Sequence, residues 1–209
     1  MEHTVKIVGT GPGDGRYITP LALDLIREAE VLVGGKRLLE QLAGPHQEQF
    51  AIASDLPAVL EFIESRRSQR KVVVLASGDP GLYSIAAYLA ANMDPQYLEM
   101  IPGISSVQLM FARLKLPWQE VQILSLHGRE GEGFEGRFAR PGVTALLTGG
   151  EWTPQEIASH LLKSGLPDCP AAIGKDLSYP GEKIIRTSLS ELTEHSGDLS
   201  NCVMVVFYE

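Results

Sequence analysis

Short apolar runs alternate with amphipathic segments through the first half of the chain. Apolar runs of about 4–8 residues are typical of strands, and apolar positions that recur every three or four residues are typical of helices. The predicted strands are residues 5–8, 30–33, 71–76 and 97–101. The first predicted helix begins at Pro20, after the cap residue Thr19. Further helices are predicted over residues 36–42, 55–69, 83–92 and 105–114. This alternation predicts an α/β domain with a mainly parallel sheet.

Residues 115–119 contain a proline and a tryptophan and indicate a hinge into a second half. The strands predicted there are residues 121–126, 143–147, 171–173, 183–186 and 203–207, with helices after Thr153 and at 189–195. Pro180 and Gly181 indicate a hairpin over residues 176–183, which favours a mixed sheet. The sequence therefore predicts two α/β domains, 1–117 and 118–209, with a mainly parallel sheet in the first and a mixed sheet in the second.

The overall charge argues against a nucleic-acid partner. The formal net charge is −8, whereas binding to a phosphate backbone needs clustered lysines and arginines. The densest basic cluster lies at the predicted end of a helix, where positive charge complements the helix dipole. Its members are Arg66, Arg67, Arg70 and Lys71. A nucleic-acid substrate is therefore disfavoured.

The apolar runs and the cysteines indicate the cellular compartment of the protein. No apolar stretch approaches the roughly 18 residues of a membrane span, and the first residues show no signal-peptide pattern. Cys169 and Cys202 are far apart in the chain and have no metal-like spacing. We expect a cytoplasmic protein with reduced thiols and no bound metal.

The first glycine loop, Gly-Thr-Gly-Pro-Gly-Asp-Gly at residues 9–15, follows a predicted strand. Dinucleotide-binding sites carry G-x-G-x-x-G at such a place. Counted from Gly9 the sixth position is Asp14, and counted from Gly11 it is Arg16. The helix also begins too late, after Thr19, to place its N-terminus at a pyrophosphate. A nicotinamide or flavin site is disfavoured.

Two further loops follow predicted strands at 77–84 and 101–106. Ligands of open α/β sheets bind at the carboxyl ends of the strands. Asp79 is suited to an amino group or to ribose hydroxyls, but it could instead cap the next helix. Ser105 and Ser106 offer hydroxyls to a polar cofactor, and Ser105 could equally be an N-cap.

Taken together, the segments 8–14, 78–80 and 102–106 resemble the tetrapyrrole methylase family, and the resemblance continues into residues 172–175. It implies two α/β domains that hold S-adenosylmethionine in the cleft between them, usually in a homodimer. The cofactor contacts that it implies are Pro12, Asp79, Leu82, Ser105, Ser106, Thr148, Gly174 and Leu199.

Within that family, the segments 34–37, 77–83 and 125–129 are similar to members that methylate C5 of a corrin precursor in cobalamin biosynthesis. The implied function is an S-adenosylmethionine-dependent C-methyltransferase. Some members carry a fused domain for C15 methylation and decarboxylation. This chain ends at Glu209, so we expect that activity in a separate protein. The alternatives are a family member acting at another carbon or on a protein side chain, and a non-catalytic binding module.

Charged residues near the loops supply candidates for the acceptor chemistry. His127 ends a predicted strand and is the first candidate for handling a proton, with Asp14 and Tyr17 as alternatives. A structural role is the competing interpretation for His127. The candidates for binding substrate carboxylates, each of which could instead be a solvated surface charge, are Arg16, Lys36, Arg37 and Arg129.

Overall fold

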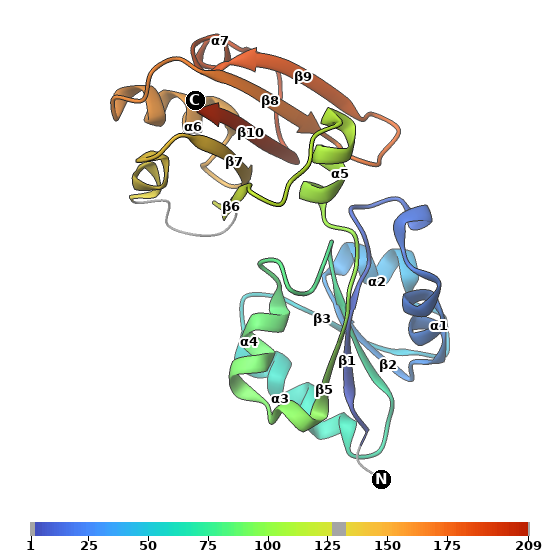
Figure 1. Ribbon diagram of the computed structural model, residues 1–209. Coiled ribbons are helices and arrows are strands. Elements are labelled where there is room, and N and C mark those ends of the chain that lie inside the picture. Colours follow the sequence, from blue (N-terminus) through green and yellow to red (C-terminus); the bar gives the residue numbers. More distant parts are fainter. Residues whose placement is uncertain (1–2, 127–132, 209) are drawn as a thin grey trace. The chain divides into compact units, whose positions relative to one another are not determined.

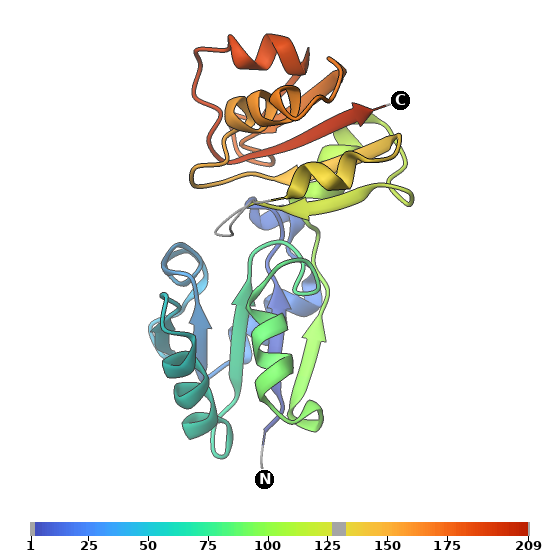
Figure 2. The same ribbon diagram turned by 90° about the vertical axis from the view of Figure 1, so that its left-hand side faces the viewer.

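The computed structural model describes residues 3–126 and 133–208 of the chain. These residues form two compact units, Met1–Ser105 and Ser106–Glu209. Each unit is an α/β layer structure built on a five-stranded sheet (Figures 1 and 2). The predicted α/β fold, with a mainly parallel first sheet and a mixed second sheet, is confirmed.

The first sheet has the strand order β3-β2-β4-β1-β5, and every neighbouring pair is parallel. Its strands are β1 (Val5–Gly9), β2 (Val31–Gly34), β3 (Glu48–Ala51), β4 (Val72–Ala76) and β5 (Leu98–Ile101). β2 and β4 are buried along their whole length, as expected for central strands covered on both faces.

Helices cover both faces of this sheet (Figure 1). They are α1 (Pro20–Glu28), α2 (Lys36–Leu42), α3 (Leu56–Arg67) and α4 (Ile85–Asn92). Successive side chains of a strand point to opposite faces. Leu32 and Val73 accordingly pack with α1 and α2, whereas their neighbours Val33 and Val74 pack with α3 and α4.

The second sheet has the order β6-β7-β10-β8-β9, in which only β6 and β7 are parallel. Its strands are β6 (Gln122–Ser125), β7 (Gly142–Leu147), β8 (Pro170–Lys175), β9 (Lys183–Ser188) and β10 (Cys202–Tyr208). The helices of this unit are α5 (Ser106–Leu114), α6 (Pro154–Lys163) and α7 (Leu189–Thr193). The expected hairpin is the β8–β9 connection.

One strand of the first sheet was not predicted. β3 is a four-residue edge strand in which half-buried and exposed residues alternate, Glu48 and Gln49 among them. Its sequence lacks the apolar run that marks the central strands, because an edge strand has a neighbour on one side only. It forms through its parallel pairing with β2, which the local sequence does not encode.

The two units divide between Ser105 and Ser106, whereas the sequence suggested a boundary after residue 117. The difference lies in α5, whose Met110 packs beneath the second sheet beside Gly174. α5 thus follows β5 of the first sheet along the chain but belongs to the second unit. In the described residues no helix is long and apolar enough to cross a membrane.

Candidate functional site

Three loops meet at the carboxyl edge of the first sheet, where β4, β1 and β5 are neighbours. The loop after β1 and the loop after β4 are joined by a backbone bridge. The Gly78 N–H donates to the Gly11 carbonyl at 2.9 Å, and the Gly11 N–H donates to the Gly78 carbonyl at 3.3 Å. The parallel strand order therefore brings together loops that are far apart in sequence.

The third loop approaches the other two through glycine. A Cβ atom at Gly103 would lie 2.3 Å from the Gly78 carbonyl oxygen and 2.8 Å from the Gly9 Cα. Real Cβ atoms do not come so close to backbone, so only glycine permits this packing. The glycines of the three loops thus fix the distance between the loops.

Asp79 connects the second loop to the third. Its Oδ2 accepts from the Gly103 N–H at 2.9 Å, and its Oδ1 accepts from the Gly81 N–H at 2.8 Å. The cap of α4 is Ser84, whose hydroxyl accepts from the Ala86 N–H. The helix-cap interpretation of Asp79 is therefore wrong, because α4 begins at Ile85, six residues further along the chain, and has its own cap.

The other cofactor residues predicted in the first half of the chain lie in these three loops or directly after them. Pro12 is half-buried between Gly11 and Gly13, whose φ angles are both positive. Leu82 is half-buried and donates its N–H to the Asp79 carbonyl. Ser105 is buried, and its Cα would lie 3.4 Å from a Cβ at Gly78. Ser106 is the first residue of α5.

Asp14 and Arg16 are paired with each other in the first loop. The Arg16 guanidinium donates to Asp14 Oδ2 from Nη2 at 2.7 Å and from Nε at 3.0 Å, and Nε also donates to Oδ1 at 3.1 Å. Asp14 also accepts from the Arg16 N–H and so caps a short 3₁₀ helix, Gly15–Tyr17. These bonds from Arg16 hold the pKa of Asp14 below its usual value. Tyr17, half-buried, closes that turn by donating its N–H to the Asp14 carbonyl.

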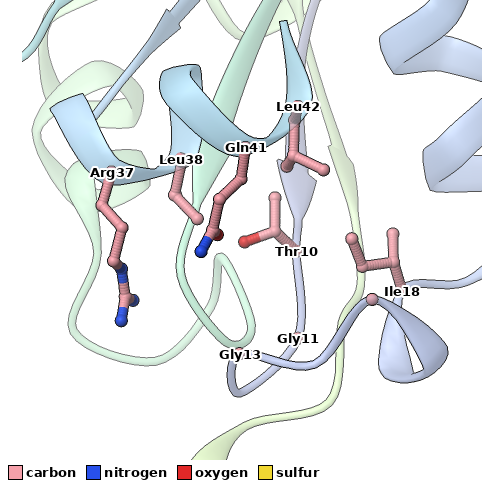
Figure 3. A pocket seen from close by; sticks show the side chains of 9 residues that line it. Thr10, Gly11, Gly13, Ile18, Arg37, Leu38, Gln41 and Leu42 are labelled. Atoms are coloured by element: carbon pink, nitrogen blue, oxygen red, sulfur yellow. The ribbon is translucent and has the colours of Figure 1, made fainter. Parts of the chain in front are cut away.

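A pocket of about 260 Å³ lies between the first loop and α2 (Figure 3). Arg37 and Gln41 line it from one side, and Thr10 and Gly13 from the other. Lys36 is exposed and lies 3.8 Å from Glu40 along the helix. Of the cations proposed for the substrate, the structure places Arg37 in this pocket.

Two predicted residues, His127 and Arg129, lie outside the described residues. The preceding strand β6 ends at Ser125, and the Leu126 N–H donates to the Leu147 carbonyl.

The predicted cofactor residues of the second unit surround the start of β10. The Thr148 hydroxyl donates to the Cys202 carbonyl at 2.9 Å. Gly174 pairs with Val203, and a Cβ there would lie 2.5 Å from the Met110 sulfur. Leu199 is buried in the core, three residues before β10. The structure thus brings these three positions to one end of the second sheet.

An ion pair that the sequence did not suggest holds the segment around Leu199. Lys175 Nζ donates to the Asp198 carboxylate at 2.9 Å and to the Asp198 carbonyl at 2.7 Å. The Asp198 carboxylate also accepts from the Ser200 N–H at 2.9 Å. These bonds, that from Lys175 first, lower the pKa of Asp198 to about 2. Only the antiparallel pairing of β8 with β10 reveals this contact, because the two residues are far apart in sequence.

No three His, Cys, Asp or Glu residues in the described part of the chain come together in a way that could hold a metal ion. The donor set at the three loops consists of a carboxylate, hydroxyls and glycine backbone.

A comparison with family models matches residues 4–193 to the tetrapyrrole (corrin/porphyrin) methylases. The chain belongs to the tetrapyrrole methylase family. The resemblance inferred from the glycine loops is confirmed.

Two curated relatives cover almost the whole chain. The "Cobalt-precorrin-7 C(5)-methyltransferase" of Salmonella typhimurium is 36% identical over 180 residues, which cover 86% of this chain and 88% of that protein. The "Probable cobalt-precorrin-7 C(5)-methyltransferase" of Methanocaldococcus jannaschii is 31% identical, with 97% of both chains covered.

Solved structures share the fold. The precorrin-6Y methylase of Archaeoglobus fulgidus superimposes with a TM-score of 0.74, at 25% identity and with 99% of both chains covered. The uroporphyrin-III C-methyltransferase of Thermus thermophilus, in complex with S-adenosyl homocysteine, has a TM-score of 0.73 at 24% identity, covering 98% of this chain and 92% of that one.

Proposed function

We propose that this protein transfers a methyl group from S-adenosylmethionine to C5 of a corrin precursor, cobalt-precorrin-7 or precorrin-6Y, in cobalamin biosynthesis. The observation that carries the proposal is the similarity, at 36% and 31% identity, to two proteins named for the cobalt-precorrin-7 reaction. The two matches cover 86% and 97% of this chain, and 88% and 97% of the two relatives.

The donor set of the three loops and of the first residue of α5 fits S-adenosylmethionine. Each carboxylate oxygen of Asp79 accepts one backbone bond, and each has a second lone pair for a ribose hydroxyl or an ammonium group. Ser105 and Ser106 add hydroxyls, and Pro12 and Leu82 add half-buried apolar surface. We assign Thr148, Gly174 and Leu199 to the same cofactor. No phosphate has to be bound, which agrees with the failed dinucleotide pattern of the first loop.

The cofactor supplies an electrophilic methyl group that already carries its leaving group. The task of the protein is then to align the macrocycle carbon with that methyl group and to exclude water. Alignment at about 3–3.5 Å contributes roughly 7–11 kcal/mol to lowering the barrier. The glycine contacts and the Asp79 bonds serve this alignment, because they fix the loops before either substrate binds.

The macrocycle carbon must lose a proton in the reaction. We retain His127, Asp14 and Tyr17 as candidates for this step. Since hydrogen bonds from Arg16 lower the pKa of Asp14, its carboxylate is ionised at neutral pH and is a weak base. An ionised carboxylate is better suited to stabilising positive charge that develops on the macrocycle. Lys36, Arg37 and Arg129 remain candidates for binding the substrate carboxylates, whereas Arg16 is already matched by Asp14.

We also propose a cytoplasmic homodimer that works beside a separate decarboxylating C15-methyltransferase. A Sinorhizobium protein named "Precorrin-6Y C(5,15)-methyltransferase [decarboxylating]" is 31% identical over 183 residues. The match covers 86% of this chain but 44% of that protein. The remainder of that longer protein is the counterpart of the partner that we propose here.

Incubation with methyl-labelled S-adenosylmethionine and cobalt-precorrin-7 tests the proposal. The expected product carries one labelled methyl group at C5, located by NMR. Transfer to a different carbon would favour another member of the family. Binding of both ligands without any transfer would favour the alternative of a non-catalytic binding module.

A further inference from the structure

We propose that the pocket between the first loop and α2 binds one peripheral carboxylate side chain of the macrocycle, and that Arg37 and Gln41 are its specificity-determining residues. The inference rests on the proposed function for the identity of the macrocycle. It adds a place and a pair of residues for one of the macrocycle's acidic substituents.

The size of the pocket limits what it can hold. Its volume is about 260 Å³, below the roughly 300–1,000 Å³ of sites that enclose a drug-sized ligand. A tetrapyrrole macrocycle is too large for this space. A single acetate or propionate substituent fits, while the ring to which it is attached remains outside.

The walls of the pocket have two different characters. Arg37 and Gln41 are four residues apart on α2 and therefore lie on the same side of the helix. Figure 3 shows that the amide end of Gln41 and the hydroxyl of Thr10 point toward one another. Ile18, Leu38 and Leu42 add an apolar wall. This combination suits a short methylene chain that ends in a hydrogen-bonding group.

The charge of the lining selects an anion. Arg37 is a cation, and no acidic residue is among the described residues that line the pocket. The Gln41 side chain is exposed and has no hydrogen-bond partner within the described part of the chain, so its NH₂ group is available to donate. The Thr10 hydroxyl donates to the Ala76 carbonyl at 3.0 Å, which anchors that side of the pocket to the sheet. A guanidinium and an amide together are typical partners of a carboxylate.

Two of the other candidate cations, Arg16 and Lys36, lie in the described part of the chain, and neither lines the pocket. Lys36 directly precedes Arg37 on α2. Of these three cations, Arg37 is the one that lines the pocket.

Binding of a stable cobalt corrin tests the proposal without requiring turnover. Two probes are titrated by absorbance, a corrin with free carboxylate side chains and the same corrin with those groups esterified. Arg37→Met should weaken binding of the free-carboxylate corrin about tenfold, the lower end of a charge-assisted hydrogen bond. Arg37→Lys should restore most of the affinity. The control is Arg27→Met, which removes an exposed cation paired with Asp24 on α1, and it should leave the affinity unchanged.

A second pair of variants tests the sign of the ligand's charge. Gln41→Met removes the donor, and Gln41→Glu adds an anion of nearly the same shape. The expected order of affinity is wild type, Gln41→Met, Gln41→Glu, and the differences should vanish with the esterified corrin. Equal affinity of wild type and Arg37→Met, or tight binding by Gln41→Glu, would overturn the proposal.

The same samples separate this inference from the proposed function. If Arg37→Met binds the free-carboxylate corrin normally while wild type methylates cobalt-precorrin-7, the pocket assignment fails and the function stands. If wild type transfers no methyl group but corrin binding depends on Arg37 and Gln41, the function fails and the carboxylate site stands. The affinity for S-adenosylmethionine, measured by calorimetry, should be unchanged in all four variants.

Discussion

The carboxylate of Asp79 and the backbone N–H of Gly103 form a 2.9 Å hydrogen bond that joins two loops 24 residues apart in sequence. The same carboxylate holds the Gly81 N–H with its other oxygen. Asp79 is therefore part of the framework of the site as well as a candidate ligand of the cofactor. A change at this position should affect both the shape of the loops and the binding of the donor.

Asp79→Ala should weaken S-adenosylmethionine binding by at least tenfold, measured by calorimetry. The variant loses the carboxylate that we propose as a ligand of the donor, and it leaves the partly buried Gly103 N–H without its acceptor. A buried donor left without an acceptor costs about 1–3 kcal/mol. The matched control is Ser84→Ala in the same loop, which removes the cap of α4 and should lower stability by about 1 kcal/mol. Donor binding should survive in that control. If both variants weakened donor binding equally, the loss in Asp79→Ala would come from lower stability, and Asp79 would not be a ligand of the donor.

Gly103→Ala should destabilise the first unit by about 1–3 kcal/mol, measured by urea unfolding. The new methyl group would meet backbone atoms of Gly78 and Gly9, which cannot turn aside as a side chain can. Gly15→Ala is the control, because a Cβ there has no atom within 4 Å. That variant should be as stable as wild type or slightly more stable. Equal stability of both variants would contradict this prediction, because it would mean that the three loops can move apart at little cost in the free energy of unfolding.

Helices and their caps were predictable from the sequence. Thr19, Asp55 and Thr153 each accept a bond from the third residue after them, as their positions before amphipathic segments indicated. Such signals are local, since a cap and its partner lie within one turn. The Arg16–Asp14 pair is equally local, and its two-residue spacing could have revealed it.

Contacts between distant segments were not predictable in the same way. The bond from Gly103 to Asp79 depends on β1 lying between β4 and β5. The pocket forms because α2 packs beside the first loop. The sequence therefore did not indicate Gln41 as a pocket residue, apart from its four-residue spacing from Arg37. The order of the glycine loops along the chain was enough to identify the family. The hydrogen-bond partner of each side chain could be assigned only once the order of the strands in the sheet was known.

The two cysteines should resist alkylation at pH 8 in the folded protein and react after unfolding in urea. Burial raises the pKa of Cys202 to about 12 and also raises the pKa of Cys169, so little thiolate is present at pH 8. Both thiols are free and buried. Mass spectrometry after a short pulse of iodoacetamide counts the labelled residues. Rapid labelling of Cys202 in the native protein would mean that the start of β10 opens.

Lys175→Met should raise the pKa of Asp198 from about 2 toward its ordinary value of 3.8, because the hydrogen bond from Lys175 is the largest cause of the lowered pKa. The folded-state pKa lies below the unfolded one. The carboxylate of the wild type therefore contributes its full stability above about pH 4, and this contribution is lost as the pH falls toward 2. In the variant this loss should be smaller, since less of the shift remains. A carboxyl-carbon NMR titration of Asp198 measures the change directly.

A companion measurement connects the Lys175–Asp198 pair to the donor. Lys175 fixes Asp198, and Asp198 fixes Ser200, so the pair encloses the backbone of Leu199 from both sides. If that backbone contacts S-adenosylmethionine as we propose, Lys175→Met should raise the KM for the donor severalfold and leave the KM for the macrocycle unchanged. Lys175→Arg should restore the donor KM, because a guanidinium can reach the same carboxylate. Lys6→Met, which breaks the pair with Glu99 on the first sheet, is the control and should change neither constant. A pKa that moves without any change in the donor KM would place Leu199 outside the cofactor site.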